Sequence, residues 1–171
     1  MPHLLFVCHG NVARSPAAEV IARSRLSPRS DWSVSSAGIG ALTGRPIAED
    51  VARALAEHGH DPSGHAARQV DREVLAPADL VLCMAREQRA WLLDEFPRDA
   101  RKILVFGRAH RLSGRAPRHV AGLEHLLLAQ EPATADDDVP DPYRRGLAAA
   151  RETVARLEHG VAEVVGLLGA R

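Results

Sequence analysis

The chain has 171 residues, 46% of them hydrophobic and 26% charged, and a formal net charge of zero at pH 7. This composition predicts one domain over residues 1–171, and the neutral charge argues against binding to nucleic acid or to an anionic membrane surface. The only cysteines, Cys8 and Cys83, are too few for a disulfide scaffold or a structural zinc site. We therefore expect a cytoplasmic protein with reduced thiols, no metal and no cofactor. The apolar runs are too short for membrane insertion or a signal peptide.

Short apolar runs alternate with helical patterns from the N-terminus to about residue 106. Buried strands are predicted at His3–Cys8, Trp32–Ser36, Asp79–Met84 and Lys102–Phe106, and helices at 15–26, 48–58 and 86–96. Ser15 is expected to cap the first helix, with Pro16 at its first position. The alternation predicts an α/β fold: a single three-layer domain with a four-stranded parallel sheet and helices on both faces.

The last third of the chain has a different pattern. Residues 107–140 are rich in Gly, Pro, Arg and His, and we expect a long loop there that is functional or mobile. A final helix is predicted after Asp141-Pro142-Tyr143, because apolar residues from Leu147 to Leu168 recur every three or four positions.

Cys8 begins a C-x5-R-S motif that ends at Arg14-Ser15. The motif alone is weak evidence, because Cys83 also has an arginine six residues later. Context separates the two cysteines: Gly10 and Asn11 can adopt the positive φ angles that turn backbone N–H groups toward an anion, and the next helix adds its positive end. No glycine follows Cys83, so we interpret it as a buried structural thiol.

The residue types suit phosphate chemistry. The inward N–H groups, the helix N-terminus and Arg14 would all favour the nucleophilic thiolate of Cys8. The planar guanidinium of Arg14 can bind two phosphate oxygens at once, and the Ser15 hydroxyl can donate to the departing thiolate. A proton donor is also needed. Spacing alone leaves Asp136, Asp137, Asp138 and Asp141 as candidates.

Taken together, these segments resemble the low molecular weight protein-tyrosine phosphatases along almost the whole chain. The matching segments, in the family's order, are VCHGNVARSP after the first strand, Ser35–Gly38, Gly64–Val70, ADLVLCM, and Val139–Gly146 around Asp-Pro-Tyr. The resemblance implies a phosphate-binding loop after the first strand and selects Asp141 as general acid beside the catalytic Cys8 and Arg14. The phosphate-binding residues it implies are His9, Gly10, Asn11, Val12, Ala13, Arg14 and Ser15.

The resemblance also assigns supporting residues and partners. Asn11, Ser15, Ser36 and His65 would support the loop, and Leu42, Tyr143 and Arg144 would form the pocket wall. Residues 36–42, 64–70 and 141–145 are similar to a bacterial subgroup that acts with membrane tyrosine autokinases in capsule and exopolysaccharide export. The implied substrate is a phosphotyrosine protein, specifically the Tyr-rich tail of such a kinase, and the enzyme is expected to be a monomer.

The chain departs from the family at three places, and three rival functions bear on its interpretation. Ala13 replaces a second loop cysteine, Ala85 replaces an acidic residue, and the segment before Asp141 is long. Because Cys83 is expected inside the third strand, beyond the Cα separation of about 7 Å that a disulfide tolerates, we expect no Cys8–Cys83 bridge. An arsenate reductase needs more cysteines near that strand, and a protein-arginine phosphatase needs a small polar residue at Val12. A non-catalytic phosphotyrosine-binding module would not need Cys8, Arg14 and Asp141.

Overall fold

The computed structural model describes residues 1–26, 31–116 and 121–169, which contain a four-stranded parallel sheet. Its strands are β1 (His3–Cys8), β2 (Ser33–Gly38), β3 (Leu80–Cys83) and β4 (Ile103–Val105), in the order β2-β1-β3-β4. β1 pairs with β2 on one side and with β3 on the other. The carboxyl end of β1 is therefore central, and this is where open α/β sheets bind ligands.

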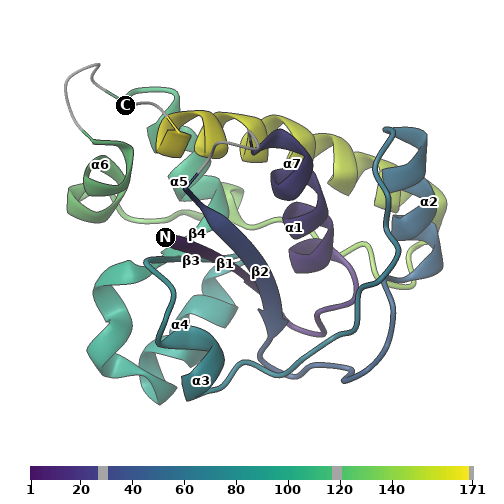
Figure 1. Cartoon of the computed structure of the whole chain (residues 1–171), viewed down its shortest axis with the longest axis horizontal. Helices are drawn as coiled ribbons and strands as arrows, with labels where there is room; N and C mark the ends of the chain where they lie inside the picture. Colours follow the sequence, from purple (N-terminus) through teal and green to yellow (C-terminus); the bar gives the residue numbers. More distant parts are fainter. Residues whose placement is uncertain (27–30, 117–120, 170–171) are drawn as a thin grey trace.

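Helices cover both faces of this sheet, as the sequence predicts (Figure 1). One face carries α1 (Arg14–Arg25), α2 (Glu49–Glu57), α5 (Phe106–Ser113), α6 (Gly122–Leu128) and α7 (Gly146–Gly169). The other face packs against α3 (Arg72–Leu75) and α4 (Arg86–Glu95). The described residues also include the 3-10 helices η1 (Pro97–Lys102) and η2 (Ala135–Asp137). Among the described ranges, no helix is both long and apolar enough to cross a membrane.

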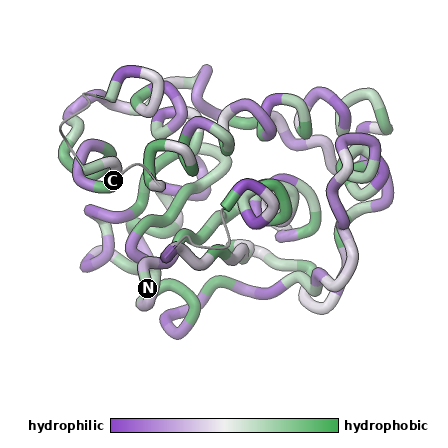
Figure 2. Tube along the Cα trace, turned by 45° about the horizontal axis from the view of Figure 1, so that its top comes forward, coloured by the Kyte–Doolittle hydropathy of each residue, from purple (hydrophilic) through white to green (hydrophobic). Residues whose placement is uncertain are grey.

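The core of the described residues consists of two apolar clusters, one on each side of the sheet. Successive residues of a strand point to opposite faces, so Phe6 and Cys8 of β1 join the cluster under α1 and α7, while Val7 joins the one against α4. Figure 2 shows how hydrophobic and hydrophilic residues alternate along the peripheral helices, whose apolar sides supply the rest of both clusters. This packing fixes β1, and with it the position of Cys8.

The start of α1 differs from the prediction. Its N-cap residue is Ala13, so Ser15 and Pro16 lie inside the first turn, and no side chain caps the helix. Proline is tolerated in the first turn because the N–H groups there have no partner within the helix. The Ser15 hydroxyl is instead used in the loop that follows β1, where it contacts the Cys8 sulfur.

The prediction of a long loop over 107–140 is wrong for its described part, which holds α5, α6 and η2; residues 117–120 lie outside the described residues. Phe106, Ala109 and Leu112 are buried at helical spacing, but the helix is short and Gly107 weakens the pattern. Glycine at position 107 allows the Asp137 backbone to pack closely against α5. A Cβ atom at this position would lie 2.3 Å from the carbonyl oxygen of Asp137 and 2.5 Å from its Cα.

Asp137 fastens the end of this segment to α5. Its buried carboxylate accepts hydrogen bonds from the Thr134 backbone at 2.7 Å and from Arg111 Nη2 at 3.1 Å. Burial by itself would raise the pKa of Asp137, but the bonds from Arg111 and Thr134 outweigh it and hold the pKa below its usual range. The anchor therefore adds stability above the ordinary aspartate pKa and loses it as pH falls through the lowered value.

We predict that Gly107→Ala destabilises the chain by roughly 1–3 kcal/mol, the usual range for forcing extra atoms into a packed site. The reason is that the new methyl group displaces the Asp137 backbone, four residues before Asp141. Urea unfolding measures the change. Gly166→Ala is the matched control, since a Cβ atom there meets nothing within 4 Å. Equal stability of Gly107→Ala and wild type would show that the contact is not close-packed in solution.

Candidate active site

Cys8 is the last residue of β1, and residues 9–13 connect it to the N-terminus of α1. Its side chain is buried, and its Sγ atom lies 3.0 Å from the Ser15 hydroxyl. The Ser15 Oγ atom also lies 3.2 Å from the Ala37 carbonyl oxygen, a second acceptor for the same proton. If Cys8 is ionised, a hydrogen bond between Ser15 and the sulfur requires the hydroxyl to be the donor, because a thiolate carries no proton.

The backbone of this connection takes an uncommon conformation at Asn11, whose φ is +54°. Asparagine is among the few residues that tolerate this region. Gly10, predicted to share it, lies outside it. A second glycine makes the close approach possible: a Cβ atom at Gly38 would lie 2.4 Å from the His9 carbonyl oxygen and 3.0 Å from the Asn11 nitrogen. The bend therefore needs Asn11 within the connection and Gly38 beside it.

The buried Asn11 side chain uses all of its hydrogen-bonding groups on its surroundings. Its Nδ2 atom donates to the hydroxyls of Ser15 at 3.0 Å and Ser36 at 2.9 Å, while Oδ1 accepts from the Arg68 backbone at 2.9 Å. The Asn11 carbonyl lies 2.8 Å from the His65 ring nitrogen Nε2. The four residues predicted to support the loop are therefore brought into one network.

The network also includes two residues that the sequence analysis missed, Glu19 and Arg68. Glu19 is buried on α1 and accepts a hydrogen bond from Ser36 at 2.5 Å, so the Ser36 hydroxyl passes from Asn11 on one side to a carboxylate on the other. Arg68 contributes its backbone N–H to Asn11 and its Nε atom to the Ser36 carbonyl. These contacts could not be predicted from the sequence, because no regular spacing relates Glu19 or Arg68 to the residues that they contact.

Arg14 lies at the start of α1 and extends toward the turn that precedes α7. Its Nη2 atom pairs with the Asp141 carboxylate at 2.9 Å, and Nη1 donates to the Val139 carbonyl at 3.2 Å. Its Nε atom is buried without a hydrogen-bond partner among the described residues. This N–H group is a donor available to an anion. Asp141 itself stays 42% exposed and accepts from the Tyr143 backbone.

These groups line one cavity of about 160 Å³. Its lining residues are Cys8, His9, Gly10, Val12, Ala13, Arg14, Gly40, Leu42, Asp141 and Tyr143. Val12, Leu42 and Tyr143 supply apolar walls above the polar floor. Arg144, predicted for the wall, is not among the lining residues; its guanidinium instead lies over the Tyr143 ring, 5.2 Å from the centroid. Asn11 and Ser15, predicted to bind phosphate, are not among the lining residues, and their side chains belong to the hydrogen-bond network.

Cys83 faces away from this cavity. Its neighbour in the register is Val7, so strand geometry puts its Cα atom roughly 6 Å from that of Cys8, within disulfide range. The expectation that distance alone prevents a Cys8–Cys83 disulfide is therefore wrong. The two side chains instead belong to clusters on opposite faces of the sheet, which prevents a bond. Burial also raises the pKa of Cys83 far above its usual range.

Comparison with known proteins agrees with this arrangement. Residues 3–122 match the model of the family described as low molecular weight phosphotyrosine protein phosphatase. The chain is 30% identical to "Probable low molecular weight protein-tyrosine-phosphatase EpsP" of Ralstonia nicotianae, over 92% of this chain and 90% of that protein. It is 32% identical to "Low molecular weight protein-tyrosine-phosphatase Wzb" of Salmonella typhi, over 98% and 94% of the two chains.

A solved structure extends the comparison to three dimensions. The low molecular weight protein tyrosine phosphatase from T. tengcongensis superposes with a TM-score of 0.77 and 30% identity, covering 97% of this chain and 99% of that one. The match therefore includes the sheet, the helices on both faces and the segment leading to α7. By sequence and by fold, the chain belongs to the low molecular weight phosphotyrosine protein phosphatase family.

Proposed function

We propose that this chain hydrolyses phosphotyrosine in proteins through a cysteinyl-phosphate intermediate, with Cys8 as nucleophile, Arg14 as phosphate clamp and Asp141 as general acid. The observation that carries the proposal is that the cavity at the N-terminus of α1 is lined by a thiol, a guanidinium and a carboxylate together. A helix N-terminus favours anions, so the site suits a phosphate dianion without further cations.

In the first step the Cys8 thiolate attacks phosphorus, and the bond from phosphorus to the tyrosine oxygen breaks. Asp141 gives its proton to that departing oxygen. Arg14 and the backbone N–H groups of residues 9–15 hold the phosphate oxygens as charge develops on them. The Arg14–Asp141 ion pair competes with the phosphate for the same guanidinium. Substrate binding therefore draws Arg14 toward phosphate and frees Asp141 for proton transfer.

In the second step water attacks the cysteinyl phosphate. The Asp141 carboxylate, left without its proton, removes one from the water, and the sulfur–phosphorus bond breaks to release inorganic phosphate. Ser15 donates to the sulfur as it leaves, which its 3.0 Å contact with Sγ allows. Splitting the hydrolysis in two replaces one difficult displacement by two easier ones.

The cavity walls support an aromatic leaving group. Val12, Leu42 and Tyr143 line the cavity, where a phenyl ring would make apolar contacts with them. A protein-arginine phosphatase on this fold is the second candidate, and the apolar Val12 disfavours its guanidinium substrate. Matched phosphotyrosyl and phosphoarginyl peptides discriminate the two. The arsenate reductase alternative has no support, since Cys83 is the only other cysteine and faces the opposite side of the sheet.

For the biological substrate we propose the Tyr-rich tail of a membrane tyrosine autokinase, with the phosphatase acting as a cytoplasmic monomer. The support is family resemblance in residues 36–42, 64–70 and 141–145 together with the likeness to EpsP and Wzb.

We predict that Cys8→Ser abolishes turnover of a phosphotyrosyl peptide but retains its binding, because the loop remains and only the nucleophile is lost. Cys83→Ala is the matched control and keeps most activity, since that thiol faces the opposite cluster. Steady-state assays and calorimetric titration measure the two properties. Loss of turnover in a folded Cys83→Ala protein, or faster release of phosphate from phosphoarginine than from phosphotyrosine, contradicts the proposal.

We predict that Asp141→Ala slows hydrolysis of phenyl phosphate by about 10²–10⁴-fold, the usual contribution of a general acid. The loss is smaller for p-nitrophenyl phosphate, whose leaving group departs without a proton. Comparing kcat/KM on the two esters isolates proton transfer from positioning. Asp138→Ala serves as control because Asp138 is committed to Arg86 at 3.1 Å. Equal losses on both esters would reject Asp141 as the acid.

We predict that peroxide inactivates the enzyme without forming an intramolecular disulfide. Position 13 of the loop, where many relatives carry a second cysteine, is Ala13, which cannot form a disulfide with Cys8. The other cysteine, Cys83, points to the opposite face of the sheet. Prolonged exposure then carries Cys8 to sulfinic acid, which thiols do not reduce. Peptide mass spectrometry followed by reduction and assay tests this. A Cys8–Cys83 bridge with full recovery of activity would disprove the opposed side-chain directions.

A further inference from the structure

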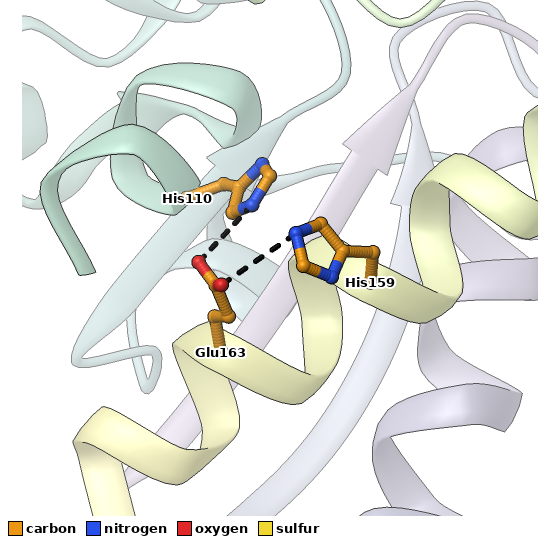
Figure 3. A group of neighbouring side chains, drawn as sticks. All are labelled: His110, His159 and Glu163. Carbon is orange, nitrogen blue, oxygen red and sulfur yellow. Dashed lines mark ion pairs between the residues drawn. The ribbon is translucent and has the colours of Figure 1, made fainter. Parts of the chain in front are cut away.

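Three side chains far from the phosphate loop converge between α5 and α7. His110 of α5 meets His159 and Glu163 of α7, and the ligand atoms of all three lie within 4.8 Å of one another. Figure 3 shows the two imidazoles directed at opposite oxygens of one carboxylate. His110 Nε2 lies 3.1 Å from Glu163 Oε2, and His159 Nε2 lies 3.5 Å from Oε1. His159 and Glu163 share a helix face because they are four residues apart.

We propose that His110, His159 and Glu163 form a binding site for Zn²⁺ that clamps α5 to α7. Two imidazoles and one carboxylate are a zinc ligand set, with water as the fourth ligand. Ligands about 2.1 Å from a tetrahedral ion lie roughly 3.4 Å from each other. The two imidazole–carboxylate distances, 3.1 Å and 3.5 Å, are of this size, although they end on different oxygens of Glu163. The ligand atoms of His110 and His159 lie within 4.8 Å of each other, and small rotations of the exposed His159 and of Glu163 would bring the two imidazoles close enough to share one ion. The expectation of no metal rested on the small number of cysteines, and this ligand set contains none.

The surrounding structure holds the first ligand in place. The His110 ring stacks on Phe106 at a centroid distance of 6.4 Å and meets the His159 ring edge-on at 5.1 Å. Gly160 lets the helices approach: a Cβ atom there would lie 2.6 Å from Phe106 Cζ and 3.3 Å from His110 Cγ. The neighbouring cation, Arg156, donates to the Asp136 carbonyl at 2.6 Å, so its guanidinium is engaged elsewhere.

The site is separate from the phosphatase chemistry. His159 lies 13 residues beyond Gly146, the first residue of α7, which corresponds to about 20 Å of helix. The ion would connect the helix that follows β4 with the helix that follows Asp141. It would therefore fasten the two ends of the 107–145 segment. The proposal rests on the cluster itself and is independent of the catalytic roles given above.

The test is zinc binding by the chelator-stripped Cys8→Ser protein, in which the reactive thiol cannot compete for metal. We expect one Zn²⁺ per chain by calorimetry, visible d–d bands of tetrahedral Co²⁺, and a higher thermal midpoint with Zn²⁺. His159→Ala and Glu163→Gln should each weaken binding by roughly 100-fold or more, since even outer-shell losses cost about 10–100-fold.

The control combines His58→Ala with Glu152→Gln, two exposed residues outside the cluster, and should bind zinc like its parent. His159 is exposed, so its truncation leaves the fold intact and the comparison interpretable. No zinc binding by the parent protein, or unchanged affinity in both cluster variants, would overturn the proposal. A loss equal in the control and the cluster variants would do the same, because it would place the ion elsewhere.

Discussion

The Asn11 side chain is the contact on which the rest of the site depends. Residue 11 has a positive φ, and its buried amide ties that backbone to Ser15 of α1, Ser36 of β2 and the Arg68 backbone. The partners lie on α1, on β2 and in the segment before α3, so the loop after β1 is held at three points. A buried polar network of this kind favours one arrangement strongly, because an unmade hydrogen bond at any member is costly. The backbone of residues 9–13 is thereby held in one conformation, on which the proposed phosphate binding depends.

The second requirement is the position of Asp141, which comes from a distant part of the chain. Asp137 is fixed to α5 by Arg111, and the Gly107 contact lets the chain pass closely over that helix. The chain then turns to place Asp141 2.9 Å from Arg14. The proposed general acid is thus positioned by packing between α5 and the segment before α7. The proposed zinc clamp between α5 and α7 would reinforce the same geometry from its far side.

The parallel sheet and the main helices could be predicted because the strands are short apolar runs that alternate with helical patterns, and Gly59 and Pro97 mark two of the helix ends. Cys8, Arg14 and Ser15 could be found from motif and context, and Asp141 only through family resemblance. The helices within 107–140 were missed because each is short and Gly107, a packing residue, looks like a loop residue. Glu19 and Arg68 were missed because they meet Asn11 and Ser36 only after folding. The helix-start prediction failed because the Ser15 hydroxyl serves Cys8 instead of a cap.

The most direct test of the account is to find where phosphate is attached during turnover. The wild-type enzyme is mixed with excess phosphotyrosyl peptide and quenched in the steady state. The phosphorylated residue is then mapped by mass spectrometry under conditions that preserve phosphorus–sulfur bonds. We expect phosphate on the Cys8 sulfur and on no other residue. Phosphate on the neighbouring His9, or rapid turnover of wild type with no phosphorylated cysteine at any time, would contradict it.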